Sequence, residues 1–330
     1  MKAVLEKLIQ YETLTQAEAK SVLLDIGQGQ CNSHQIAAFL TTYMMRTVTV
    51  EELSGFRAAL LDLCVAIDLS DYNPIDLCGT GGDGKDTFNI STLASFVTAG
   101  AGVKVAKHGN YGVSSSCGSS NVMEYLGVKF SNEKTFLEQC IDQAGICVLH
   151  APLFHPAMKH VAPVRRDLGL KTFFNMLGPL VNPAFPKHQM VGVFSLELLR
   201  IYSYLLEETD QRYSIIHALD GYDEISLTGE AKIASNGDTY MVDANTFGLT
   251  PLKASEIGGG ESVEDAAQIF INVLSNQSTP AQRQVVCANA AVAISTAKEI
   301  SLQDGFATAE ESLDSGRALL ALQSLQKLSA

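Results

Sequence analysis

A glycine-rich segment at residues 76–92 has the residue types of a phosphate-binding loop. Glycines stand at positions 79, 81, 82 and 84, directly after a short apolar stretch. Glycine adopts positive φ and lets backbone N–H groups approach an anion closely. Asn89, Ser91 and Thr92 then lead into an apolar run that could begin a helix, whose N-terminal end attracts anions. We predict a phosphate site here, although glycine clusters also form plain turns. The spacing is neither that of a Rossmann loop nor that of a Walker loop, which disfavours nicotinamide and ATP sites.

A second polar segment, residues 107–120, also follows a short apolar stretch. Lys107 offers a positive charge, and His108 and Asn110 offer directional hydrogen bonds. Gly109 and Gly112 would permit a close approach by a ligand. Three serines could donate to phosphate oxygens: Ser114, Ser115 and Ser119. A solvated linker is the alternative, but the Lys-His pair directly after an apolar strand favours a binding loop.

Two adjacent carboxylates, Asp223 and Glu224, follow another apolar stretch. In a parallel sheet, residues just after a strand are presented to ligands. Magnesium is commonly held by one or two carboxylates together with substrate phosphates and water. The doublet is therefore a candidate metal site, and a solvated acidic loop is the alternative.

Residues 155–167 form a basic stretch in an acidic protein. Arg165 or Arg166 could hold a carboxylate through two parallel hydrogen bonds, and ordinary surface charge is the alternative. The prolines at 179 and 183 and the glycine at 178 suggest a rigid turn or hinge between domains.

The elements that must position these residues fall into two kinds. Up to about residue 70 the apolar spacing predicts helices, with Thr15, Ser33 and Thr49 as helix starts. After Pro74, strands and helices alternate, which predicts a mostly parallel sheet with active loops at the carboxyl ends of its strands. The predicted strands are 75–78, 103–106, 147–149, 190–194 and 213–219, and 232–242 is predicted to be a hairpin with an Asn236-Gly turn. The predicted helices are 91–101, 121–126, 196–209, 263–274, 281–297 and 302–328.

Composition limits the possible partners. The 330 residues are 46% hydrophobic and 18% charged, with a net charge of -13. A strongly acidic chain is a poor general binder of nucleic acid or anionic membrane. We see neither a signal peptide nor a run of apolar residues long enough to span a membrane. The seven cysteines are scattered, which favours reduced thiols and a cytoplasmic protein.

Taken together, the motifs resemble the anthranilate phosphoribosyltransferase family, whose members share a fold with nucleoside phosphorylases. The resemblance spans nearly the whole chain, with its motifs in the same order. It is carried by Gly79-Thr-Gly-Gly-Asp83, Asn89-Ile-Ser-Thr92, Lys107-His-Gly-Asn110, Ser114-Ser115, Val161-Ala-Pro-Val-Arg165, residues 174–183, and Asp223-Glu224.

This resemblance implies an α/β fold with a small all-helical N-terminal domain, residues 1–70 with about 166–185, and a larger domain, residues 71–330. The larger domain would contain a mostly parallel central sheet flanked by helices, and the site would lie between the domains. The family implies transfer of a phosphoribosyl group from phosphoribosyl pyrophosphate to the amine of anthranilate, a step of tryptophan biosynthesis. It also implies a homodimer formed through the helical domain.

The resemblance also implies roles for particular residues. Phosphoribosyl pyrophosphate would be held by Gly79, Gly82, Asp83, Thr87, Asn89, Ser91, Thr92, Lys107 and Ser119. The wider substrate-binding set would add Ile90, Gly109, Tyr111, Gly112, Val113, Ser114 and Ser115. Two Mg²⁺ ions would be held by Ser91, Asp223 and Glu224. Anthranilate would meet Asn110 and Arg165 with His108 nearby, and the catalytic set would be Lys107, His108 and Arg165.

The sequence departs from the family at three positions near the second segment. Tyr111 stands where many relatives have Arg, which removes a positive charge, and Cys117 and Asn121 replace the more usual Ser and Asp. Two other functions remain open from the residues alone. One is a pyrimidine nucleoside phosphorylase, which needs no acidic metal pair, and the other is a non-catalytic relative that binds nucleic acid.

Overall fold

The computed structural model describes residues 1–112 and 117–330, and the chain divides into two units. The helical unit contains residues 1–67 and 151–185, and the α/β unit contains residues 68–150 and 186–330. The returning segment of the helical unit begins at Ala151, whereas the family resemblance implied a start at about residue 166.

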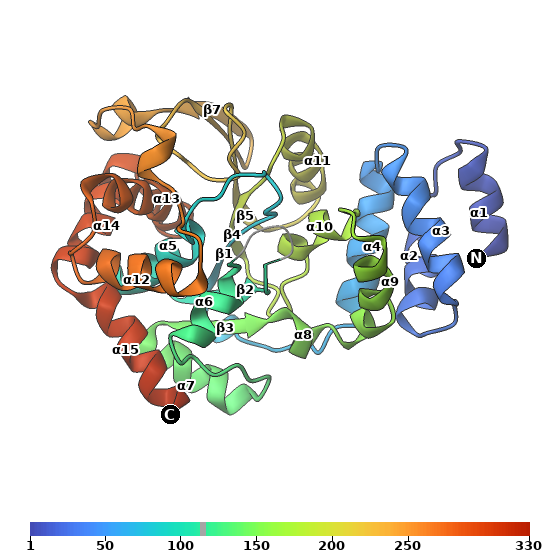
Figure 1. The fold of residues 1–330 in the computed structure, drawn as a ribbon, viewed down its shortest axis with the longest axis horizontal. Helices are drawn as coiled ribbons and strands as arrows, with labels where there is room; N and C mark the ends of the chain where they lie inside the picture. Colours follow the sequence, from blue (N-terminus) through green and yellow to red (C-terminus); the bar gives the residue numbers. More distant parts are fainter. Residues whose placement is uncertain (113–116) are drawn as a thin grey trace. The chain divides into compact units, whose positions relative to one another are not determined.

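The helical unit begins with four helices, α1 (Lys2–Ile9), α2 (Gln16–Gly27), α3 (Ser33–Met44) and α4 (Val50–Asp62). Thr15 and Thr49 cap α2 and α4 in reciprocal capping boxes with Glu18 and Glu52, as predicted. The predicted cap of α3 is one residue off, because Asn32 rather than Ser33 accepts from the backbone of Gln35. The returning segment adds α8 (Ala151–Phe154), α9 (Ala162–Leu168) and α10 (Phe174–Leu177), with short 3-10 turns at 156–160 and 178–180 (Figure 1).

Aromatic rings join the two segments of the helical unit into one core. Phe173 stacks on Phe56 with ring centroids 4.5 Å apart, and it also meets Phe39 and Tyr43 edge-on. Such pairs add about 0.5–1.5 kcal/mol each beyond the burial of their area. Residues 1–67 and 151–185 are therefore parts of one folded unit.

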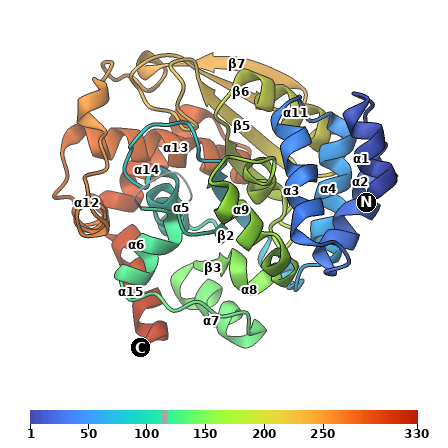
Figure 2. The ribbon, with the colours of Figure 1, turned by 45° about the vertical axis from the view of Figure 1, so that its right-hand side comes forward.

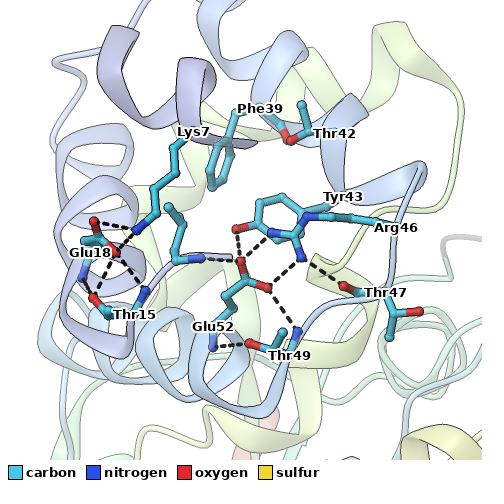
Figure 3. Close-up of polar contacts among 11 residues, drawn as sticks. Lys7, Thr15, Glu18, Phe39, Thr42, Tyr43, Arg46, Thr47, Thr49 and Glu52 are labelled. Atoms are coloured by element: carbon cyan, nitrogen blue, oxygen red, sulfur yellow. Dashed lines mark hydrogen bonds and ion pairs between the residues drawn. The ribbon is translucent and has the colours of Figure 1, made fainter. Parts of the chain in front are cut away.

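A buried carboxylate ties the first four helices together (Figure 3). Glu52 of α4 is fully buried, and its oxygens accept from the backbone N–H of Leu14 at 2.9 Å and the hydroxyl of Tyr43 at 3.0 Å. Arg46 makes an ion pair with the same carboxylate through two nitrogens. The network links the α1–α2 connection, α3 and α4.

The α/β unit is built on a seven-stranded sheet in the order β3-β2-β1-β4-β5-β6-β7. The strands are β1 (Ile75–Gly79), β2 (Val105–Gly109), β3 (Ile146–His150), β4 (His188–Gly192), β5 (Arg212–Ala218), β6 (Ala231–Ser235) and β7 (Asp238–Val242). The first five are parallel to their neighbours, and the hairpin β6–β7 continues the sheet antiparallel beyond β5 (Figure 2). Strand order reverses direction around β1, and ligands of open α/β sheets bind at such a switch point.

Helices pack against both sides of this sheet. The helices α5 (Ile90–Gly100) and α13 (Pro280–Lys298) contact β1, β4 and β5 on one side, and α11 (Leu196–Glu207) contacts β5 and β6 on the other (Figure 1). The remaining helices are α6 (Ser119–Tyr125), α7 (Lys134–Ala144), α12 (Val263–Leu274), α14 (Leu302–Asp314) and α15 (Arg317–Ser329).

Two predictions about these elements were wrong. The single helix predicted over 302–328 is two helices, because the chain turns at Gly316 with φ of 73°. The strand predicted over 103–106 begins and ends later, at Val105–Gly109. Lys107 and His108 therefore belong to a buried strand rather than to the loop after it.

In the described ranges, 1–112 and 117–330, we find no single helix that is both long and apolar enough to cross a membrane. The pair α13 and α14 passes that test only when joined, and it is bent by 115°.

Candidate active site

The first glycine-rich loop wraps around the side chain of Asp223. Gly81, Gly82 and Gly84 have φ of 59°, 77° and 75°, the left-handed region for which glycine is suited. The backbone N–H of Gly81 donates to Asp223 Oδ2 at 2.8 Å. A Cβ on Gly79 would lie 2.5 Å from the same oxygen, so a side chain does not fit there. The glycines therefore allow this loop to close on a carboxylate.

Glu224 makes the equivalent contact at the other end of this loop. Its Oε1 accepts from the backbone N–H of Ser91 at 3.0 Å, in the first turn of α5. Asp223 and Glu224 are only 7% and 9% exposed. The acidic doublet thus lies against both ends of the first loop, as the parallel-sheet argument predicted.

Burial and mutual repulsion make this pair difficult to ionise. Burial, followed by the charge of Asp83, raises the pKa of Asp223 to about 7. Burial and the charge of Asp223 raise the pKa of Glu224 well above its ordinary value. Two buried carboxyl groups next to one another favour a bound cation or protons.

The donor set fits magnesium that arrives with a phosphorylated substrate. Asp223 and Glu224 offer hard oxygen ligands, and backbone N–H groups orient both carboxylates. Across the part of the chain that the structure describes, no group of three or more His, Cys, Asp or Glu side chains is arranged to enclose a metal ion. Magnesium needs no such cage, because phosphate oxygens and water complete its coordination.

Lys107 and His108, at the carboxyl end of β2, are buried rather than displayed. Lys107 is 2% exposed, and its Nζ donates to the carbonyl oxygen of Leu77 on β1. Burial lowers the pKa of Lys107. His108 is 5% exposed, and its backbone N–H donates to Asp76 Oδ1 at 3.0 Å.

Asn121 connects residues on the two sides of the second loop. Its Oδ1 accepts from the backbone N–H groups of Gly112 and Gly118, both at 3.0 Å. The carbonyl oxygen of Asn110 accepts from Ser119 Oγ and from the backbone of Ser120. The predicted contacts of Val113, Ser114 and Ser115 lie outside the described residues.

Asn89 joins the two loops. Its Nδ2 donates to the carbonyl oxygen of Cys117 at 3.1 Å, and Asn89 itself precedes the first turn of α5. The structure thus brings the first loop, the second loop and the acidic doublet together at the carboxyl ends of the parallel strands.

Tyr111 packs on aromatic groups at the end of β3. Its ring meets the His150 ring edge-on at 4.8 Å, and His150 stacks on Phe130 at 4.4 Å. Its hydroxyl lies 3.4 Å from both carboxylate oxygens of Glu124.

Other residues of the predicted substrate set contribute in different ways. Asp83 Oδ1 accepts from the backbone of Lys85, and Thr87 pairs with Gly258 in an isolated bridge. Ile90 and Thr92 are almost fully buried in α5, so little of either side chain reaches solvent. A Cβ on Gly109 would lie 2.6 Å from Ser119 Oγ, which explains the glycine there.

Arg165 belongs to the helical unit, unlike the rest of the predicted set. It lies in α9, where its Nη2 donates to Asn175 Oδ1 at 3.2 Å and its guanidinium lies 5.4 Å from the centre of the Phe174 ring. Burial lowers its pKa. The other predicted site residues that the structure describes belong to the α/β unit.

Sequence reasoning missed three residues that shape this site. Asp76 and Asn121 accept hydrogen bonds from backbone N–H groups of the second segment. Gly192 leaves room for Asp223, because a Cβ on residue 192 would lie 1.5 Å from the Asp223 carbonyl oxygen. Asp76 carried a usable signal, because a charged residue within an apolar strand needs a partner. Gly192 carried none, because its partner Asp223 is distant in the sequence. Asn121 accepts from backbone groups only three and nine residues before it, so its role is a local one.

Comparison with known proteins defines the class of this fold and site. Residues 2–64 match the helical bundle domain of a glycosyl transferase family, and residues 71–319 match the a/b domain of the same family. The chain is 64% identical to anthranilate phosphoribosyltransferase of Christiangramia forsetii, covering 100% of this chain and 99% of the relative. It is 63% identical to that of Flavobacterium johnsoniae, covering 100% of both. The chain belongs to the anthranilate phosphoribosyltransferase family.

Solved structures of this family have the same fold. Anthranilate phosphoribosyltransferase from Thermus thermophilus superposes with a TM-score of 0.92 at 34% identity, covering 98% of each chain. The enzyme from Saccharomyces cerevisiae in complex with PRPP and Mg also gives a TM-score of 0.92, at 27% identity, covering 100% of this chain and 98% of that one.

Proposed function

We propose that this chain transfers the phosphoribosyl group of 5-phosphoribosyl 1-pyrophosphate to the amine of anthranilate, giving N-(5-phosphoribosyl)anthranilate and pyrophosphate. The observation that carries the proposal is the closure of a glycine-rich loop on a buried acidic doublet, through Gly81 with Asp223 and Ser91 with Glu224. The names of the relatives support the acceptor, and the yeast complex supports PRPP and magnesium. The reaction is a step of tryptophan biosynthesis.

The protein's main task in this reaction is to stabilise a departing anion. As the bond from C1 to the pyrophosphate oxygen lengthens, the sugar gains positive charge and the pyrophosphate gains negative charge. Backbone N–H groups of the first loop, the N-terminal end of α5 and the ammonium of Lys107 are suited to that charge. We propose that Ser91, Asp223 and Glu224 hold two Mg²⁺ ions. Bound magnesium would neutralise part of the pyrophosphate charge.

The second task is to position the acceptor. An aromatic amine is already neutral near pH 7, so holding it at attack distance from C1 matters more than removing its proton. Arg165 would hold the carboxylate beside the amine, and Asn110 would add a hydrogen bond. His108 would shape this side of the pocket or accept the released proton.

The proposed contact of Arg165 with the carboxylate of anthranilate makes a quantitative prediction. Arg165→Ala should raise the KM for anthranilate by about 10- to 100-fold, because a hydrogen bond to a charged group contributes about 1.5–3 kcal/mol. The KM for phosphoribosyl pyrophosphate should change little. Arg166→Ala removes an exposed arginine next in sequence and serves as the matched control. Equal KM values for anthranilate in the two variants would remove the assignment.

A fluorescence assay tests the function directly. Anthranilate loss is followed with phosphoribosyl pyrophosphate and Mg²⁺, and the chain itself contains no tryptophan to obscure the signal. We expect consumption of anthranilate with both additions, and none when either is left out. Thymidine with phosphate is assayed in parallel. Phosphorolysis of thymidine without any turnover of anthranilate would instead indicate a pyrimidine nucleoside phosphorylase.

We also propose that the chain works in the cytoplasm as a homodimer formed through its helical unit. Large apolar side chains are exposed on that unit, with Ile9 at 67%, Tyr11 at 75% and Met45 at 72%. Apolar surface of this kind favours an interface between protein chains. The net charge of -13 argues against nucleic acid as a partner.

A further inference from the structure

A buried carboxylate behind the site has no role in the chemistry above. Asp76 lies in β1 with no exposed surface. Its Oδ1 accepts from the backbone N–H of His108 at 3.0 Å, and the Cys78 thiol lies 3.5 Å from its Oδ2. Burying a charged group is costly unless the fold uses it.

Asp76 lies directly after the residue at which the register pairing of β1 with β2 ends. Strands β1 and β4 pair at all five positions of β1, whereas β1 and β2 share one register pair, Ile75 with Val105. Beyond that pair, side chains connect the two strands. Asp76 accepts from His108, and Lys107 donates to the carbonyl oxygen of Leu77. The carboxyl end of β2 is therefore held to β1 partly by these two side chains.

Asp76 and Lys107 are also connected electrostatically. Lys107 is 2% exposed, and burial lowers its pKa; Cys78, Asp76 and Glu224 act in the opposite direction. A buried ammonium is stable only with compensating charge nearby. Glu224 is a proposed ligand of magnesium, so its charge is shared with the metal. Asp76 lies outside the proposed metal site.

We propose that Asp76 is a positioning residue, whose carboxylate keeps Lys107 as a cation beside the pyrophosphate site and fixes the backbone at His108 beside the acceptor. The inference rests on the proposed function, because it assigns Asp76 to the residues that meet those two substrates. The two effects are separable, since one depends on the charge of Asp76 and the other on its hydrogen bond.

Two substitutions separate charge from hydrogen bond. Asp76→Asn keeps an oxygen that accepts from His108 and removes the charge. It should weaken binding of magnesium pyrophosphate by about tenfold in calorimetry, and leave the KM for anthranilate near that of the unchanged protein. Asp76→Ala also removes the acceptor, so the KM for anthranilate should rise by about tenfold as well. Cys287→Ala, a neutral change at a buried thiol of α13, is the control and should alter neither quantity.

A double-mutant cycle tests whether Asp76 acts through Lys107. In a Lys107→Met background, Asp76→Asn should no longer weaken binding of magnesium pyrophosphate. The proposal is overturned if Asp76→Asn binds magnesium pyrophosphate as tightly as Cys287→Ala, or if it loses the same factor with and without Lys107. The Asn variant alone decides the charge effect if the Ala variant does not fold. Failure of the unchanged protein to consume anthranilate would reject the proposed function, and the pyrophosphate data would still stand.

Discussion

Single residues in the acidic doublet make folding depend on pH. In the folded chain, burial raises the pKa of Asp223 to about 7 and that of Glu224 well above its ordinary value, whereas carboxyl groups of an unfolded chain titrate at about pH 4. The folded state therefore holds these protons more tightly than the unfolded state does. The free energy of unfolding of the metal-free protein should fall as pH rises through this window.

Thermal unfolding in a chelator tests this expectation. The Tm of the metal-free protein should fall from about pH 5 to about pH 8, and Mg²⁺ should recover part of that loss at the higher pH. Asp223→Asn with Glu224→Gln should flatten the pH dependence and abolish turnover that requires Mg²⁺. Asp86→Asn removes an exposed carboxylate of the same loop and should keep the original slope. Turnover like that of the unchanged protein in the double variant would exclude the metal site.

The sequence indicated the chemistry of individual residues better than their surroundings. Asp223, Glu224 and the glycines of the first loop were predictable, because their types and positions after strands have a physical meaning. The burial of Lys107 was not, because the end of β2 depends on pairing with a strand about 40 residues away. The charge of Asp76 within an apolar strand indicated that it needs a partner, but not that the partner is the backbone of His108, which lies 32 residues away.

Among the elements, the helical unit depends on one buried carboxylate more than on its surface ion pairs. Glu52→Ala should reduce the free energy of unfolding by about 3–5 kcal/mol, because Arg46 would remain buried without its partner and three hydrogen bonds to Leu14, Tyr43 and Thr49 would be lost (Figure 3). Urea unfolding measures the loss.

The matched control is an exposed ion pair in the same unit. Lys20 and Asp62 lie 2.7 Å apart with side chains 38% and 52% exposed. Asp62→Ala should change stability by no more than about 1 kcal/mol. Similar losses in the two variants would show that the Glu52 network has no special importance.

Elements with strong local signals were predictable, and elements set by distant packing were less so. The capping boxes at Thr15 and Thr49 and the hairpin with the Asn236-Gly turn were confirmed. The helices α14 and α15 were predicted as one, although the Ser315-Gly316 pair between them is a turn signal. The fold class was predictable from the order of the elements.

At the scale of the whole molecule, oligomeric state provides a test that is independent of catalysis. We expect light scattering to give twice the mass of the chain. Ile9→Glu with Met45→Glu places two charges on exposed apolar positions of the helical unit and should shift the protein toward monomer. Leu320→Glu, at a position 57% exposed on α15, is the control and should stay dimeric. A monomer before any substitution would contradict the proposed dimer.

The α/β unit is interrupted in the sequence by residues 151–185 of the helical unit, and this has a consequence for the newly made chain. Strand β1 pairs with β4 at all five positions, but β4 leaves the ribosome about 110 residues after β1, once the returning segment of the helical unit has been made. At about 5–20 residues per second, one edge of β1 lacks that partner for roughly 5–20 seconds. An open strand edge invites pairing with other chains. Protection by chaperones should therefore matter most midway through synthesis.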